Sequence, residues 1–92
     1  MNEAMREKMV KRLALQKARW VVGGYENEIA DGERTGMPTQ AEMAEEVYRE
    51  MVKDPTLEGP TGSILLKKDI RFMGAPALRE IATQAVEKVS KE

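Results

Sequence analysis

The side chains with the most chemical potential in this sequence are four glutamates close together, Glu42, Glu45, Glu46 and Glu50. Paired carboxylates can perform acid–base catalysis or bind a hard cation, but catalysis needs one acid whose pKa is perturbed by a buried pocket. Their spacing instead spreads them over the outer faces of a helix, where water solvates them. No calcium-loop pattern of alternating Asp or Asn ligands occurs. We therefore expect neither a catalytic nor a metal site here.

The chain contains no cysteine and no histidine among its 92 residues. Disulfides, thiolate and imidazole metal ligands, and the usual general base near neutral pH are therefore excluded. The composition predicts a protein that is not an enzyme and needs no cofactor. A chain without cysteine also fits the reducing cytoplasm, which is the location we expect.

One glycine-rich segment, Gly59 to Ser63 (GPTGS), superficially resembles a phosphate-binding loop. It lacks both the lysine that meets the outer phosphates and the G-x-x-x-x-G-K spacing. We interpret it as a turn before a helix.

The stretch from Pro38 to Val47 (PTQAEMAEEV) resembles the first helix of a helix-turn-helix DNA-binding unit. That family continues with a short turn and a polar, basic recognition helix, whereas here the helix runs on and a loop of about eight residues follows. The resemblance implies a DNA-binding regulator with a degenerate unit around residues 38–73. Its candidate phosphate contacts are Lys8, Lys11, Arg12, Lys17, Arg19, Lys67, Lys68 and Arg71.

Charge is unevenly distributed along the chain, although the net charge is only −1. Residues 1–24 carry six basic and two acidic side chains, residues 25–62 three basic and ten acidic, and residues 63–92 six basic and four acidic. A net charge of −1 is far from that of a typical basic DNA-binding domain. This polarity favours packing of basic against acidic helices, within one subunit or across a dimer.

Hydrophobic periodicity predicts an all-α fold, a single domain of residues 1–92 built as a small bundle. The expected helices are 2–30, 40–53, 64–73 and 76–90. The second has the strongest start signal, because Thr39 and Glu42 fit a capping box. Few aromatic residues are present, so the core must consist of Met, Val, Leu, Ile and Ala.

Two points stay open at this level. The first helix either stops or bends at Gly23-Gly24, since each glycine weakens a helix by about 1 kcal/mol. Residues 64–73 fit a helical stripe through Leu66, Ile70 and Met73, but Ile70 and Phe72 also alternate with Arg71 as in a short strand.

We expect the thin core to be completed by a homodimer, because small domains bury little of their surface. The candidate dimer or partner interface is a stripe of the first helix, Met5, Met9, Leu13 and Trp20. Functionally, we expect a small non-enzymatic interaction or regulatory protein that binds another macromolecule, most simply an unidentified protein, through a helix face. DNA binding is the alternative. No membrane-spanning segment is expected, because no apolar run reaches the roughly 20 residues that span a bilayer, and we expect the basic first helix to pack against its own protein and not on a membrane surface.

Overall fold

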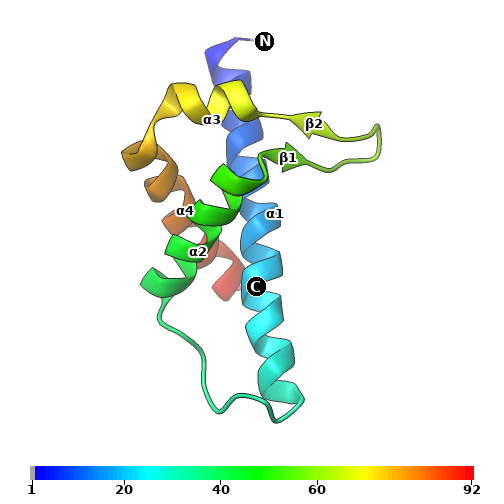
Figure 1. The fold of residues 1–92 in the computed structure, drawn as a ribbon, viewed down its shortest axis with the longest axis vertical. Helices are drawn as coiled ribbons and strands as arrows, with labels where there is room; N and C mark the ends of the chain where they lie inside the picture. Colours follow the sequence, from blue (N-terminus) through cyan, green and yellow to red (C-terminus); the bar gives the residue numbers. More distant parts are fainter. Residues whose placement is uncertain (1) are drawn as a thin grey trace.

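Helix α1 (Glu3–Ala30) runs the length of the molecule, and the other elements pack along it (Figure 1). The computed structural model describes residues 2–92. After α1 follow α2 (Gln40–Lys53), β1 (Thr56–Leu57), β2 (Ile64–Leu65), α3 (Lys67–Met73) and α4 (Ala75–Ser90). Helices α1, α2 and α4 pack against one another, and α3 lies near the N-terminal end of α1. The predicted small all-α bundle is confirmed, with a two-stranded hairpin as its one addition among the described residues.

Side-chain caps explain where helices α1 and α2 begin. The Asn2 side chain accepts the Met5 backbone N–H (2.8 Å), which satisfies one unpaired donor of the first turn of α1. In α2, Thr39 Oγ1 accepts the Glu42 N–H (3.1 Å) and donates to the Glu42 carboxylate (3.0 Å). The predicted bounds of α2 are confirmed.

Helix α1 continues without interruption through Gly23-Gly24, so the alternative in which it stops there is wrong. Neither glycine has a positive φ, and a Cβ added at either one would meet no atom within 4 Å. The protein's own packing therefore does not require glycine at these positions. Residues on both sides of the pair contact the core, and this packing holds the helix together across it.

The segment 64–73 divides into two elements, which corrects the prediction of one helix. Ile64–Leu65 forms β2, which pairs antiparallel with β1. Strand β1 itself lies in the segment after α2 that was expected to be a loop. Helix α3 begins only at Lys67, and the Leu66 N–H that precedes it donates to the Pro55 carbonyl (2.8 Å). Leu57 and Leu66 are buried, so the hairpin is fixed to the bundle by one apolar side chain from each of its arms.

All buried apolar side chains among the described residues form one cluster. They are Val10, Leu13, Ala14, Ala18, Val22, Met43, Ala44, Val47, Met51, Leu57, Leu66, Ile70, Leu78, Ile81, Ala82, Ala85, Val86 and Val89. As the composition predicts, this core holds no aromatic ring. Trp20 and Phe72 are exposed, and both tyrosines lie at its edge.

Replacing Gly23 or Gly24 with alanine should stabilise the fold, because both sites are helical and open. We expect each variant to raise the free energy of unfolding by about 0.5–1 kcal/mol, measured by urea denaturation followed by circular dichroism. Gly74→Ala is the control that should destabilise, since Gly74 has a φ of +81°. A loss of stability in both helical variants would contradict the open environment of the pair.

Candidate functional site

The predicted interface stripe of α1 does not form one exposed surface. Trp20 is 68% exposed and Met5 is 56% exposed, whereas Leu13 is fully buried in the subunit's own core and Met9 is half-buried. The hairpin also covers α1 between Met9 and Trp20. Gln16 donates to the Glu58 carbonyl (3.3 Å) and accepts the Glu58 N–H (3.2 Å). The spacing correctly identified an apolar stripe but could not show that its middle faces inward.

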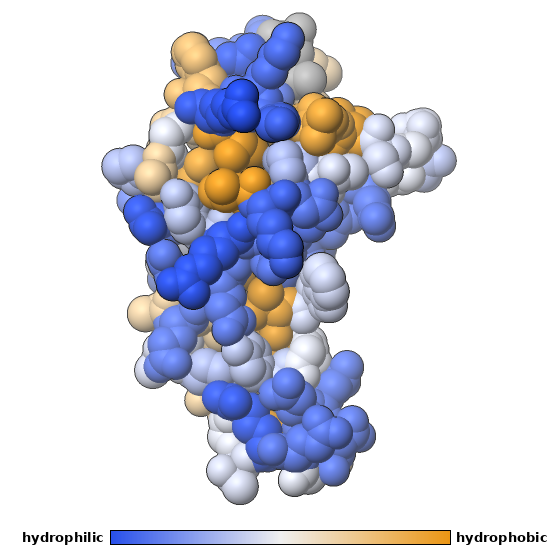
Figure 2. Space-filling view, in the orientation of Figure 1, coloured by the Kyte–Doolittle hydropathy of each residue, from blue (hydrophilic) through white to orange (hydrophobic). Residues whose placement is uncertain are grey.

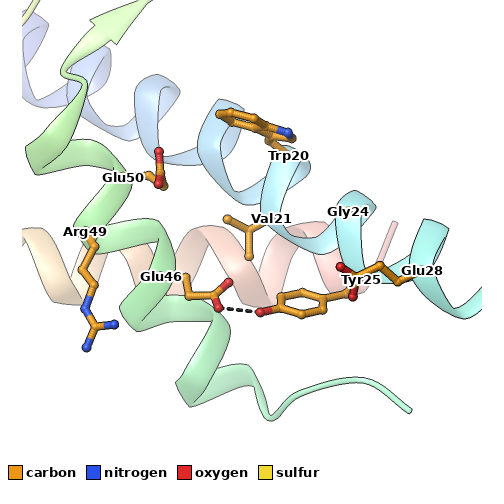
Figure 3. A pocket seen from close by; sticks show the side chains of 8 residues that line it. All are labelled: Trp20, Val21, Gly24, Tyr25, Glu28, Glu46, Arg49 and Glu50. Carbon is orange, nitrogen blue, oxygen red and sulfur yellow. Dashed lines mark hydrogen bonds between the residues drawn. The ribbon is translucent and has the colours of Figure 1, made fainter. Parts of the chain in front are cut away.

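Trp20 instead borders a groove between α1 and α2, about 440 Å³ in volume, which we call the α1–α2 groove. Its lining residues are Trp20, Val21, Gly24, Tyr25 and Glu28 from α1, and Glu46, Arg49 and Glu50 from α2. Figure 3 shows Val21 directed into the space between the helices, with Trp20 on one side and Tyr25 on the other. The groove therefore has an apolar floor with two aromatic rings beside it.

Tyr25 is held in place from two sides. Its hydroxyl donates a hydrogen bond to the Glu46 carboxylate, which joins α1 to α2 across the groove (Figure 3). The guanidinium of Arg34, from the loop after α1, lies 4.7 Å from the centre of the tyrosine ring. The hydrogen bond to Glu46 is the main cause that raises the pKa of Tyr25, and desolvation adds to it. Tyr25 is thus a neutral donor held in place by Glu46 and Arg34, which fixes this wall of the groove.

The electrostatic character of the groove is acidic. Three carboxylates, Glu28, Glu46 and Glu50, face one base, Arg49, which points away from Tyr25 in Figure 3. The nearest carboxylate to Arg49 within residues 2–92 is Glu45, outside the groove, at 3.9 Å. In the same range, neither Glu28 nor Glu50 forms an ion pair. Aromatic faces beside unpaired carboxylates form a site suited to a cation.

Gly24 lies at the groove and keeps it open. The open space above its Cα belongs to the groove, and no side chain of this chain fills it. A Cβ atom added at this position would meet no atom of the protein within 4 Å.

Lys17 lies beneath Trp20. It is the one charged residue buried in the core among residues 2–92, with 6% of its surface exposed. Its Nζ is 3.2 Å from Asp54 Oδ2 and 6.0 Å from the centre of the Trp20 ring. Lys17 was predicted to contact phosphate, but its ammonium is enclosed and already paired with Asp54. Hydrogen bonds from Thr56 and then from Lys17 hold the pKa of Asp54 below its usual value.

The other candidate phosphate contacts are exposed, and two of them are already paired with acidic side chains. They are Lys8, Lys11, Arg12 and Arg19 on α1, and Lys67, Lys68 and Arg71 on α3. Lys11 pairs with Glu7 (3.1 Å) and Arg19 with Glu92 (3.2 Å). A hairpin, not a tight turn, separates α2 from α3, so the chain departs from helix-turn-helix geometry at that point.

Two further features are absent from residues 2–92. No group of three or more potential metal-ligating side chains gathers there in a way that could hold an ion. None of the described helices combines the length and apolar character required to cross a bilayer.

Comparison with protein-family models, with curated proteins and with solved structures finds no match to this chain. The site is therefore described from the structure alone, as an acidic groove with two aromatic side chains between the first two helices of a small bundle.

Sequence reasoning did not identify most of this groove. Trp20 was selected, but Tyr25 and Glu46 come from segments 21 residues apart, and no periodicity links them. The one available signal was the glycine pair, which was interpreted as a weak point of the helix and not as a gap on its surface.

Stability should depend on pH through Asp54. Because its pKa is lower in the folded state than in the unfolded chain, its carboxylate stabilises the fold above about pH 4, and this contribution is lost as pH falls further. We expect Asp54→Asn to lower stability at neutral pH and to flatten the decline below about pH 4, measured by urea denaturation across pH. Glu26→Gln removes an exposed carboxylate that forms no ion pair within residues 2–92 and serves as the control. An unchanged acid slope in Asp54→Asn would contradict the role of the Asp54 carboxylate and its hydrogen bonds.

Proposed function

We propose that this chain is a small non-enzymatic interaction protein that binds a cationic segment of a partner protein in the α1–α2 groove. The observation that carries the proposal is the exposed Trp20 at a groove lined by Glu28 and Glu50, two carboxylates that form no ion pair within residues 2–92. Tryptophan is among the residues that contribute most to binding at protein interfaces.

The groove supplies the contacts that a lysine or arginine side chain needs. The aliphatic stem would lie on Val21 over Gly24, and the cation would lie between the Trp20 ring and the carboxylates. A cation–π contact contributes about 0.5–2 kcal/mol, and charge-assisted hydrogen bonds add to it. Tyr25 is already fixed by Glu46 and Arg34, so little conformational entropy is lost on binding.

The glycine at position 24 supports the same proposal. Glycine destabilises a helix interior by about 1 kcal/mol relative to alanine, and packing within this chain gives no reason for it. Space kept for an external side chain gives such a reason for Gly24, which borders the groove, but not for Gly23, which does not.

Blocking the groove should abolish binding without unfolding the protein. Trp20 is the single tryptophan of the chain, so its fluorescence reports on the groove during titration with a short oligoarginine peptide. We expect Gly24→Gln to weaken binding at least tenfold, because its side chain fills the space that the ligand needs. Gly23→Gln adds the same side chain one residue away, outside the groove lining, and should bind like the unmodified protein.

Two further results complete this test. A Glu28→Gln/Glu50→Gln variant should also bind weakly, and binding of the original protein should decrease with salt. Equal affinity of the Gly23 and Gly24 variants, or no change in Trp20 emission on titration, would reject the groove as the binding site.

A second copy of the chain is a specific candidate for the cationic partner. In that case the complex is a homodimer, as predicted from the sequence. The N-terminal half of α1 is basic, with Lys8 and Arg12 exposed, and is therefore complementary in charge to the groove of another subunit. This dimer differs from the one predicted from the sequence, because Leu13 is not available to it.

Sedimentation equilibrium at micromolar concentration tests the homodimer. We expect a monomer–dimer equilibrium that Gly24→Gln shifts towards monomer, with Gly23→Gln as the matched control. A monomer at every concentration would contradict the homodimer and leave a different protein as the partner.

A further inference from the structure

A second surface of the molecule has the opposite charge. It lies where the C-terminal end of α2 meets the hairpin and α3, and forms a groove of about 540 Å³ that we call the basic groove. Its apolar part consists of Val52, Leu65 and Ile70, and its bases are Lys53, Lys67 and Arg71. Figure 2 shows apolar surface gathered at this end of the molecule, bordered by hydrophilic side chains.

The apolar part of the basic groove is accessible to a partner. Leu65 is 65% exposed and Val52 is 49% exposed, while Ile70 lies buried beneath them. Leu65 points outward because the hairpin is fixed to the bundle through Leu57 and Leu66 instead. Exposed aliphatic side chains from two elements, α2 and β2, therefore give this groove apolar surface that is open to solvent.

The charges around this patch are unbalanced. Lys53, Lys67 and Arg71 form no ion pair with any acidic side chain of residues 2–92. The one acid lining the groove is Asp54, and Lys17 already binds its carboxylate at 3.2 Å. The groove therefore offers three free cations around aliphatic surface.

We propose that the basic groove is a second docking site, which binds an acidic amphipathic helix of a partner protein. Leucine-type side chains of that helix would cover Val52 and Leu65, and its carboxylates would meet Lys53, Lys67 and Arg71. A single-stranded nucleic acid fits less well, because it binds through bases stacked on aromatic rings, and this groove has none. The exposed Phe72 lies in a different depression, with Arg6 over its ring at 5.1 Å.

This site is independent of the α1–α2 groove, since the two have no lining residue in common and select ligands of opposite charge. The chain would then connect a cationic segment with an acidic one.

The experiment uses a fluorescein-labelled synthetic helix with leucines on one face and glutamates on the other, and measures anisotropy at moderate salt. We expect saturable binding to the full chain and at least a tenfold weaker affinity in Lys67→Glu/Arg71→Glu. Lys88→Glu/Lys91→Glu, which changes the net charge equally at the end of α4, should bind like the unmodified protein. Leu65→Ser keeps every charge and should also weaken binding several-fold. Circular dichroism confirms that each variant is folded.

Several outcomes would overturn the proposal. These are absence of binding by the unmodified chain, equal binding of a scrambled peptide of the same composition, and equal loss in both charge-reversal variants. Tighter binding of a DNA oligonucleotide that is insensitive to Leu65→Ser would show a nucleic-acid surface instead. Self-association that Leu65→Ser abolishes would identify a second copy as the occupant. Gly24→Gln should leave binding of the acidic peptide unchanged. A result against binding at one groove is therefore distinguishable from a result against binding at the other.

Discussion

The ion pair between Lys17 and Asp54 is the constraint on which the arrangement of this molecule depends. A lysine in the middle of the core-facing stripe of α1 must have a partner, because a buried charge without one is costly. Asp54 is the residue at which α2 ends, so the pair fixes the exit of α2 and the start of the hairpin against α1. Trp20 lies over the lysine, and Asp54 lines the basic groove. One interaction thus lies between two oppositely charged surfaces.

The acidic and basic segments of the sequence form different helices of the fold. The acidic middle of the chain supplies α2, whose glutamates turn towards Tyr25 and Trp20 on one side and pair with Arg79 of α4 on another. The later basic segment supplies α3, where Lys67 and Arg71 are left without partners within residues 2–92. Opposite charges therefore neutralise each other only in part, and each of the two grooves is lined by charges that form no ion pair within residues 2–92.

Much of the fold could be predicted from local signals, and most of the site could not. The cap at Thr39 and the proline after Asp54 define α2, and apolar periodicity defines α1 and α4. The hairpin was missed because its strands are two residues long and are held by pairing and by Leu57 and Leu66, not by an alternating pattern. Leu13 and Trp20 share one stripe in sequence, yet one is buried and the other exposed. That distinction depends on where the hairpin and α2 lie, which is tertiary information.

The central claim, that the α1–α2 groove receives a cationic side chain, is tested most directly by nuclear magnetic resonance of the full chain during titration with an oligoarginine peptide. The account predicts that the Trp20 indole N–H and the backbone amides of Gly24 and Tyr25 shift together and saturate at one concentration. Shifts spread evenly over all exposed acidic residues, with those three signals unmoved, would contradict it.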